Sequence, residues 1–441
     1  MKNNNRNIIY LLSFILLTNI AVAQELVSPS KAVTLALENN HGIKIADKNL
    51  EVAENNTSIY NSGYLPTVTG NAGATYNLDN IEAEFTNGQS TTLNNAESSR
   101  YNASLSLNYV LFDGLGRKYN YQRLKEQYQL TELQARETIE NTITQLFSIY
   151  YNVSQSTENV EALEETLTIS KDRLKRSKYE YEYGQVTKLS VLNAEVDINN
   201  DSINLLTARQ QLQSAKRDLN FVLGNAIDGD FNVDTNVNFI TLLHKEALLE
   251  KAKARNVLIL QANKTIDIGN LDIKTNRAAY LPTLGLTGTY GWNKNNNNQA
   301  SFVAVSTNTG LSGGLNLSWN LFDGGTTKTR LQNARINLEN SQLQKEQTEL
   351  SIIRDFNNAW DDYQNKLTIF KAQEINIVTA QNNFENSKEK FKLGRVNSIE
   401  FRQAQLNLLN VEVNKNRAKY EAKLAELLLL QLSGELLEVE L

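Results

Sequence analysis

An internal duplication constrains this chain more than any other feature of its sequence. Four short motifs occur twice, in the same order and at nearly constant separation. They are Tyr-Leu-Pro-Thr at 64–67 and 280–283, Leu-Phe-Asp-Gly at 111–114 and 321–324, a Gly-x-Val step at 184–186 and 394–396, and a glycine at Gly224 and Gly434. Recurrence in a fixed order is typical of a repeated structural unit. We therefore predict a first repeat at 24–225, a linker at 226–243, a second repeat at 244–434 and a short tail at 435–441.

The N-terminus has the three parts of a secretory signal peptide. Lys2 and Arg6 form a basic start, an apolar stretch covers 8–20, and Ala-Val-Ala at 21–23 provides an A-x-A cleavage site. A membrane anchor is the alternative, but the apolar stretch is shorter than the roughly 20 residues that a spanning helix needs. We expect residues 1–23 to be removed and the mature chain to be exported.

Composition excludes most kinds of chemistry. The chain of 441 residues has no Cys, which excludes disulfides, thiol catalysis and zinc–thiolate sites. Its two His, His41 and His244, are far apart in sequence, and no His/carboxylate group has the spacing of metal ligands. The net charge is -5 without a basic block, which argues against a nucleic-acid partner. We expect no catalytic residues, no metal site and no cofactor.

Each repeat begins with a helical pattern and continues into two strands. The helices are expected at about 30–63 and 244–279, and a Leu-Pro step ends each because the residue before proline avoids helical geometry. Apolar and polar residues then alternate, which indicates strands with one apolar and one polar face. The strands are expected at 68–78, 103–111, 284–292 and 315–321, with outer loops at 79–99 and 293–310.

The apolar face of these strands suits lipid. Small neutral residues such as Asn, Ser, Thr and Gly occupy the opposite face. Strands of this kind, with aromatic residues near their ends, are typical of transmembrane barrels with apolar residues on the outside. For either hairpin alone, a soluble antiparallel sheet on a core is the alternative. The residues predicted to face lipid are Leu105, Leu107, Tyr109, Leu315, Leu317 and Trp319.

Very long helices follow the strands. Neither Gly nor Pro occurs at 118–183 or at 326–393, and apolar residues, among them Leu350 and Tyr363, recur at spacings of three, four and seven. The pattern favours helices packed side by side in coiled-coil fashion. A glycine turn then leads into a returning helix, so that each pair forms a hairpin with the glycine at its tip. The returning helices are expected at about 187–222 and 397–432.

The expected fold class is therefore α+β, with long antiparallel coiled-coil helices and four strands per chain. Four strands cannot close a barrel, and an open strand edge cannot lie in lipid. The barrel must then be shared between chains. Three chains would supply twelve strands and two chains eight, and strand arithmetic alone leaves both open.

These motifs resemble those of the TolC-like outer membrane efflux protein family over essentially the whole mature chain. The most specific are the Tyr-Leu-Pro-Thr steps, the Leu-Phe-Asp-Gly steps and the tip sequence at 183–194. The resemblance implies a homotrimer whose twelve-stranded barrel in the outer membrane continues into a periplasmic α-barrel. It also implies a passive exit duct of a tripartite efflux or type I secretion system, with a periplasmic adaptor (membrane fusion) protein and an inner membrane pump as partners.

The resemblance also implies roles for residues at the tips. It places the adaptor on Gly184, Val186, Thr187, Gly394, Val396 and Asn397. Some family members ring the lumen with Asp residues just after the tip. Glu400 stands at one such position and is the candidate periplasmic gate, while Gln403, Ser190 and Asn193 occupy the others. Asn397 and Glu400 also have the spacing of a helix capping box, so both roles stay open for Glu400.

An exported coiled-coil scaffold or adhesin is the competing class, because long heptad stripes would serve it equally well. The two strand hairpins argue against it, since a stalk has no use for strands with an apolar outer face. An exported enzyme is a third and weaker alternative, because the chain offers no constellation of catalytic groups.

Overall fold

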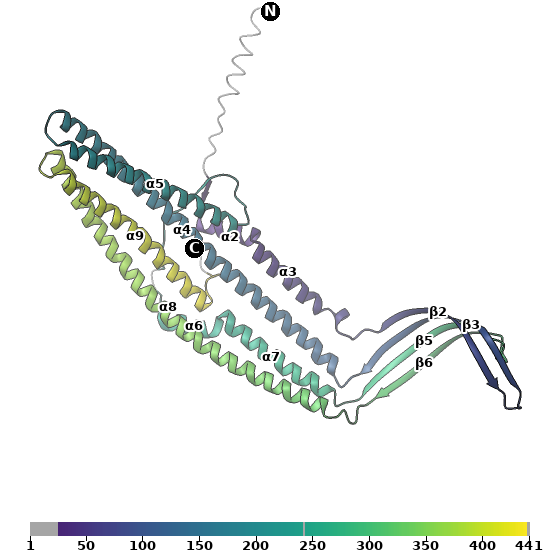
Figure 1. Ribbon diagram of the computed structural model, residues 1–441. Coiled ribbons are helices and arrows are strands. Elements are labelled where there is room, and N and C mark those ends of the chain that lie inside the picture. The colour runs from purple at the N-terminus through teal and green to yellow at the C-terminus, as the bar shows by residue number, and fades with distance from the viewer. Residues whose placement is uncertain (1–24, 241–242, 439–441) are drawn as a thin grey trace, which may run out of the picture. The chain divides into compact units, whose positions relative to one another are not determined.

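The computed structural model describes residues 25–240 and 243–438, and the expected signal peptide at 1–23 lies outside them (Figure 1). One series of elements occurs twice along the described chain. The first series is α2 (Pro29–Asn39), α3 (His41–Asn56), β2 (Thr67–Glu84), β3 (Ser90–Phe112), α4 (Gly116–Glu182) and α5 (Lys188–Val222). The second is α6 (Lys245–Arg255), α7 (Val257–Ala278), β5 (Thr283–Asn296), β6 (Val305–Ser318), α8 (Thr326–Lys392) and α9 (Ser398–Ser433). Two short strands, β1 (Glu25–Val27) and β4 (Phe231–Val233), precede the first and second series.

The chain divides into two compact units. Within the described residues, the helical unit comprises 25–45, 137–240, 243–256 and 351–438. The sheet unit comprises Ala46–Arg136 and Val257–Leu350, and it contains the four long strands. Both α4 and α8 contribute residues to each unit.

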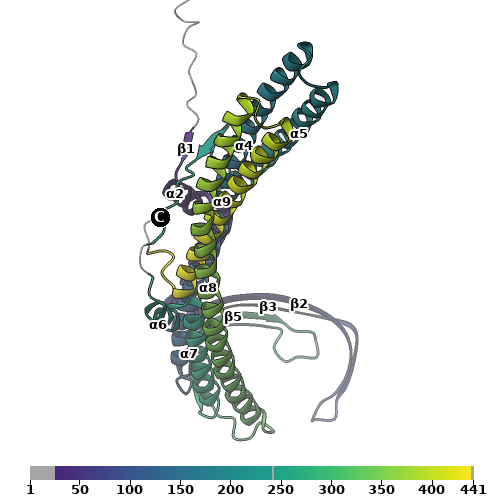
Figure 2. The same ribbon diagram turned by 90° about the vertical axis from the view of Figure 1, so that its left-hand side faces the viewer.

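The two longest helices, α4 and α8, have 67 residues each. At 1.5 Å per residue, each is about 100 Å long. They reach this length because neither contains proline and because glycine is confined to the first residue of α4. Each is followed by a returning helix, α5 or α9, and Figure 2 shows the two resulting hairpins. All four helices begin and end within two residues of the ranges predicted from sequence.

The first helix of each repeat is broken, whereas the sequence pattern predicts one continuous helix. The breaks fall at Asn40 and Asn256, whose ψ angles of 127° and 128° lie outside helical geometry. The side-chain amide of Asn40 donates to the Val222 carbonyl at 2.8 Å, and that of Asn256 donates to the Leu432 carbonyl at 3.0 Å. Each asparagine thus satisfies a carbonyl at the end of its repeat's last helix, where intrahelical partners run out.

The glycines that close the two repeats lie against the same breaks. Gly224 and Gly434 have φ of 72° and 74°, in the left-handed region. A Cβ at Gly224 would lie 2.5 Å from the Asn39 carbonyl oxygen, and one at Gly434 would lie 2.7 Å from that of Arg255. Backbone conformation and space therefore both require glycine here.

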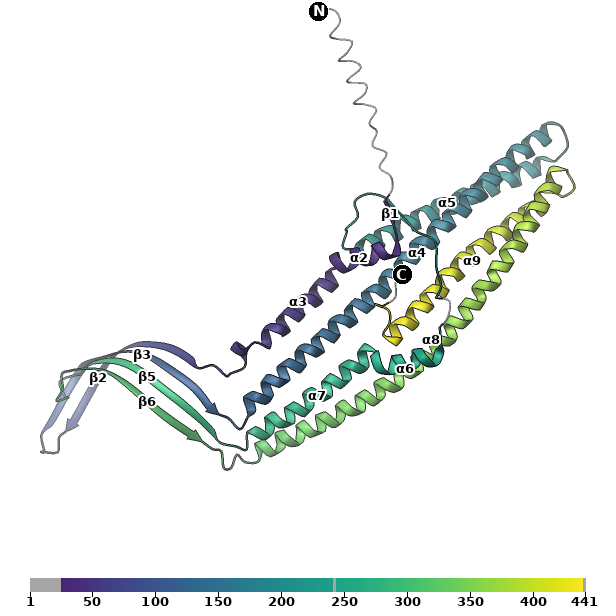
Figure 3. The same cartoon turned by 180° about the vertical axis from the view of Figure 1, so that it is seen from behind.

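The four long strands form one antiparallel sheet in the order β2-β3-β5-β6 (Figure 3). The central pair, β3 and β5, is in register from Ser99 opposite Asn296 to Phe112 opposite Leu284. The two hairpins therefore join into a single surface, with β2 and β6 as its edges.

The strands extend beyond the ranges predicted from sequence, so the predicted loops at 79–99 and 293–310 are wrong. The connections cover only 85–89 and 297–304. Their flanks are rich in Asn, Ser and Thr, which the sequence pattern assigns to loops, but main-chain pairing between strands does not depend on those side chains. β6 also ends at Ser318, so Trp319 lies just past the strand, where its Nε1 donates to the Tyr280 carbonyl at 3.1 Å.

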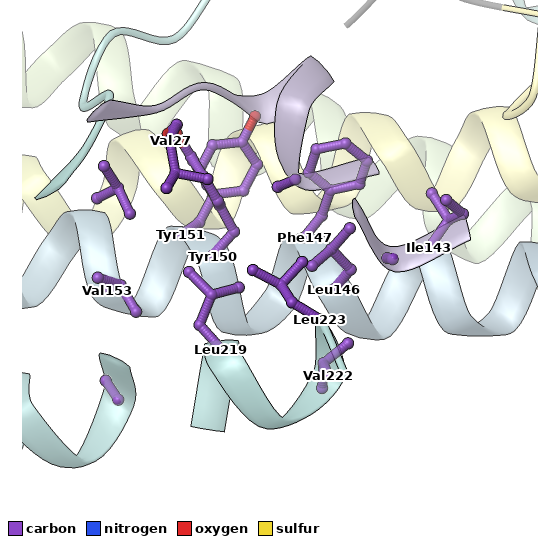
Figure 4. Close-up of a cluster of buried hydrophobic side chains, with 14 of the residues drawn as sticks. Val27, Ile143, Leu146, Phe147, Tyr150, Tyr151, Val153, Leu219, Val222 and Leu223 are labelled. Carbon is purple, nitrogen blue, oxygen red and sulfur yellow. The ribbon is translucent and has the colours of Figure 1, made fainter. Parts of the chain in front are cut away.

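The core of the helical unit lies where α4, the end of α5 and β1 meet (Figure 4). The spacing of apolar residues predicts a helical stripe on α4 through Ile143, Leu146, Tyr150 and Val153, and all four are buried here, which confirms this part of the coiled-coil pattern. The labelled side chains are Val27, Ile143, Leu146, Phe147, Tyr150, Tyr151, Val153, Leu219, Val222 and Leu223.

The linker between the repeats is held to the helices through its main chain. β4 pairs in parallel with β1, and the buried Tyr150 hydroxyl donates to the Val27 carbonyl at 2.8 Å while accepting from the Asp234 N–H at 3.0 Å. Burial raises the pKa of Tyr150, which keeps this hydroxyl protonated. On α9, Lys423 donates to the Asn238 carbonyl at 2.7 Å, and Glu426 accepts from the Ile240 N–H at 3.0 Å.

Candidate functional site

The strand residues predicted to face lipid share one face of the sheet. Directly paired residues point to the same side, and the register pairs Tyr109 with Leu286 and Leu286 with Leu315. By alternation, Leu105, Leu107 and Leu317 lie on this face too. Leu105, Leu107, Leu315 and Leu317 are exposed, and Tyr109 is half-buried. Contact of this face with lipid stays a prediction.

The opposite face carries a row of hydroxyl groups across all four strands. Thr69, Ser106, Thr289 and Ser312 occupy successive paired positions. The Ser106 and Thr289 hydroxyls lie 3.4 Å apart, and the Thr69 hydroxyl donates to the Ser106 carbonyl at 3.5 Å. These small neutral groups suit a surface in contact with water.

The Leu-Phe-Asp-Gly motifs start the long helices. The Asp113 carboxylate accepts from the Arg117 N–H at 2.8 Å, and the Asp323 carboxylate accepts from the Thr327 N–H at 2.7 Å. Side-chain and main-chain hydrogen bonds from Thr327 hold the pKa of Asp323 below its usual value. Gly114 has φ of 68°, and a Cβ there would lie 2.6 Å from the Ala278 carbonyl oxygen. The motif is thus a capped turn that directs the chain from strand into helix.

The tips of both helical hairpins are glycine turns of one kind. Gly184 and Gly394 have φ of 73° and 69°, and nothing lies within 4 Å of a Cβ built on either. The N–H of the next residue donates back to the helix, from Gln185 to the Glu180 carbonyl and from Arg395 to the Lys390 carbonyl, both at 2.8 Å. The glycines therefore serve the left-handed turn that ends a helix, and no neighbour requires their small size.

The residues beside the two glycines have different surroundings. Val396 packs against a cluster of Phe384, Phe391, Phe401 and Leu408, in which the Phe391 and Phe401 rings stack 4.7 Å apart. Val186 is half-buried, while Thr187 is exposed and makes no capping hydrogen bond to α5. The predicted docking residues are therefore anchored in an apolar cluster only at the second tip.

The predicted helix cap at Glu400 is present. The Asn397 side chain accepts from the N–H groups of Ile399 and Glu400 at 3.0 and 2.9 Å, and the Glu400 carboxylate accepts from the Asn397 N–H at 3.3 Å. This reciprocal pair is a complete capping box. Glu400 is exposed in the single chain, and a second role as a gate stays a prediction.

Sequence reasoning missed a buried charged network just behind the tips. It joins α4, α5 and α9. The Arg402 guanidinium donates to both Asp201 carboxylate oxygens, at 2.8 and 2.7 Å, and the Ser170 hydroxyl donates to the same carboxylate at 2.6 Å. Arg173 forms an ion pair with Asp197. Burial lowers the pKa of Arg173, and Asp197 opposes this effect.

One signal in the sequence could have indicated the network. Asp197 and Asp201 are four residues apart, so they share one face of a helix that is otherwise expected to pack there. In the structure, Arg173, Asp197 and Arg402 also line a groove between the two tips, whose rim includes the exposed Leu189 and Ile399.

The described residues show neither a metal centre nor a helical membrane span. Over 25–240 and 243–438, no group of three or more His, Asp or Glu side chains could hold a metal ion. No described helix is long and apolar enough to cross a membrane. His41 begins α3, and His244 directly precedes α6.

Comparison with known proteins gives a consistent answer. The family model described as outer membrane efflux protein matches residues 32–225 and 248–435. The chain is 21% identical to outer membrane efflux protein BepC of Brucella suis, over 97% of this chain and 89% of that protein. It is 23% identical to outer membrane protein TolC of Escherichia coli, over 79% and 72%. The crystal structure of the Campylobacter jejuni CmeC outer membrane channel superposes with a TM-score of 0.76 at 18% identity, covering 92% of this chain and 86% of that one.

The sheet with its one apolar face, together with the two long helical hairpins, defines an outer membrane channel subunit. Such a subunit is a transport protein and not an enzyme. The match to both repeats then shows that the chain belongs to the outer membrane efflux protein family. It is located in the outer membrane and extends into the periplasm. Its membership decides against the coiled-coil scaffold or adhesin.

Proposed function

We propose that the chain forms a homotrimeric, passive exit duct of a tripartite efflux or type I secretion system. Residues 1–23 are removed on export, and the two repeats, 24–225 and 244–434, each contribute one strand hairpin and one helical hairpin. Three chains together supply the twelve strands of a barrel in the outer membrane. The helical hairpins extend into the periplasm toward a membrane fusion adaptor and an inner membrane pump.

The observation that carries this proposal is the sheet with two unpaired edges. β2 and β6 each pair on one side only, and one face of the sheet exposes Leu105, Leu315 and Leu317. In lipid, an unpaired edge leaves main-chain groups without partners at a cost of several kcal/mol each, so other copies must complete the barrel. The resemblance to the channels of this family supports three as the number of chains in the barrel.

The tips support docking of an adaptor. The groove between them combines exposed aliphatic side chains, Leu189 and Ile399, with the polar groups of Asn193 and Asn397. Exposed apolar side chains bordered by polar groups are typical of a surface that another protein covers. The proposal also places Glu400 on the lumen side of the tips, as the periplasmic gate. Three carboxylates around a narrow pore attract cations and repel each other.

Val186→Asp tests the docking surface. Val186 is not part of the phenylalanine cluster at the second tip, although it lines the same groove as Phe391 and Val396, so the change adds a charge at the tip without placing it inside that cluster. We expect loss of efflux, measured as sensitivity of whole cells to the pump's substrates, while the barrel stays assembled as judged by heat-modifiable migration on a gel. Val396→Asp is a poorer test because it also places a charge in the cluster.

Gln185→Asn at the neighbouring exposed position is the matched control and should retain efflux. If Val186→Asp cells keep full efflux with normal protein levels, the tips are not the docking surface.

A further inference from the structure

The first strand hairpin extends well past the second. β3 loses its β5 partner after the pair Ser99–Asn296, and from there β2 and β3 continue as a two-stranded ribbon. We call residues 77–98 the arm. It continues the curve of the sheet in Figures 1 and 3, at the end of the strands away from the helices. Because the helices are periplasmic, the arm lies on the outer side of the membrane.

The arm bends at a β-bulge. Two residues of β3, Asn94 and Asn95, stand opposite the single Asn80 of β2. Asn95 has φ of 54°, and its N–H donates to the Asn80 side chain at 2.9 Å. A bulge of this kind redirects a strand at the point where it occurs.

Beyond the bulge, the apolar and polar faces of the ribbon are exchanged. On β2, the face that carries Tyr76 and Leu78 continues with the exposed Glu82 and Glu84. The face that carries Asn77 and Asp79 continues with the half-buried Ile81, Ala83 and Phe85, and Leu93 pairs with Ile81 on the same side. The side that is polar and water-facing within the barrel thus becomes apolar above it.

The exchanged face meets the connection between β5 and β6. The Phe85 and Phe302 rings lie edge to face with centroids 6.0 Å apart, and a hollow between the two segments is lined by Leu93, Asn95 and Asn297. Despite this contact, Phe302 is 97% exposed, and its neighbour Val303 is 51% exposed. Together with Phe85, the two exposed side chains form an apolar group beside the Asn residues of the hollow, and apolar groups with a polar rim are typical of surfaces that another segment covers.

The second copy required for barrel closure supplies that cover. Closure joins the β2 edge of one copy to the β6 edge of the next. β6 begins at Val305, two residues after Val303, so the neighbour's Phe302 segment comes to lie beside the β2 strand of the arm. Each arm then has an apolar segment on both sides, one from its own chain and one from the next.

We propose that the arms and the Phe302 segments of neighbouring copies meet over the outer mouth of the duct and form an apolar constriction there. This inference rests on the proposed oligomeric duct and adds an outer barrier to it. Apolar constrictions in pores restrict flow by excluding water, without any charged gate.

Cysteine cross-linking tests the contact, because the natural chain has no Cys. In Ile81→Cys/Phe302→Cys protein, mild oxidation of the assembled channel should link copies into covalent species larger than dimers. Glu82→Cys/Phe302→Cys is the matched control. Its first thiol lies on the opposite face of the ribbon, so it should give no species above the dimer that two Phe302→Cys thiols can form. If the Ile81→Cys/Phe302→Cys protein gives nothing except monomers with an internal disulfide, the proposal is overturned.

Conductance in planar bilayers tests the consequence. Phe302→Ser should raise single-channel conductance at least about two-fold over wild type, and Glu84→Gln on the outer face should leave it unchanged. Heat-modifiable migration establishes that each variant is assembled. If the assembled Phe302→Ser channel has the same conductance as wild type, the constriction is overturned and the duct is not. If neither wild type nor Phe302→Ser conducts ions although both are assembled, the duct itself is overturned.

Discussion

The two helical tips end in the same glycine turn but are stabilised differently. At the second tip, Val396 packs into the phenylalanine cluster, and Asn397 with Glu400 caps α9. At the first tip, Thr187 stands where a cap is expected yet makes no side-chain bond to α5. The repeats therefore share a backbone plan but differ in side-chain support, with an apolar cluster and a capping box at the second tip and the Arg173–Asp197 ion pair between the two helices of the first.

Asp201→Ala should lower stability more than the other changes, because the charged network behind the tips connects α5 of the first repeat to α9 of the second. The change leaves Arg402 buried without its bidentate partner. We expect a loss of about 3–5 kcal/mol, measured by chemical unfolding of the assembled protein. Asn407→Ala, at an exposed position of α9, serves as control. If Asp201→Ala loses no more unfolding free energy than the control, the two hairpins are not held together by this network.

Leu317→Arg and Leu107→Arg compare the strand hairpins of the two repeats. If both positions lie near the bilayer midplane, each change should cost about 2–4 kcal/mol in refolding assays with lipid vesicles. Arg at Asn316 or Ser106, on the opposite face, should be tolerated. Equal tolerance on both faces contradicts the barrel assignment, and a cost at only one of the two leucines would show that the hairpins sit at different depths.

Asn397→Ala and Thr187→Ala address the caps directly. Removing the Asn397 side chain eliminates two hydrogen bonds to the start of α9 and should cost about 0.5–2 kcal/mol. Thr187→Ala should change stability little, since no capping bond is lost. Hydrogen exchange of the first turns of α5 and α9 measures both effects. Comparable loosening of the two turns would remove the distinction between the tips.

Glu400→Gln should have the smallest effect on stability, because Gln can still accept the Asn397 N–H in the capping box. The same change removes the charge of the proposed gate. Reduced cation selectivity and weaker block by multivalent cations in single-channel recordings would support the gate. If both properties match wild type, Glu400 acts only as a cap.

The sequence was sufficient for the four long helices and for the glycine turns at their tips, where long-range periodicity and glycine dominate. It failed where contacts between distant segments decide the structure. The breaks at Asn40 and Asn256 depend on carbonyls at the ends of α5 and α9, nearly a whole repeat away. Leu350 belongs to the predicted stripe of α8 but is 69% exposed, because the buried stripe falls on Ile352, Phe356 and Tyr363.

The site was predictable to a similar extent. Alternation placed Leu105 and Leu315 on faces of their own hairpins, and only the β3–β5 register puts both on one surface. The Asn-rich ends of the strands suggested loops, since composition does not reveal which main-chain groups find a partner strand. Arg402 and Asp201 lie 201 residues apart in sequence, so no local pattern could pair them.

The linker between the repeats is bound through its backbone, and this has a consequence for how the sequence can change. Lys423 donates to the carbonyl of Asn238, and Glu426 accepts from the N–H of Ile240. Neither bond depends on the side chain of the linker residue, and only proline at 240 would remove one of the two groups. The apolar side chains of the linker differ in this respect, because Phe231 and Val233 are buried in the core and Ile240 packs against it. Substitutions of the exposed Asn238 should therefore accumulate with little penalty, whereas a linker of different sequence grafted into this chain has to keep apolar residues at 231, 233 and 240.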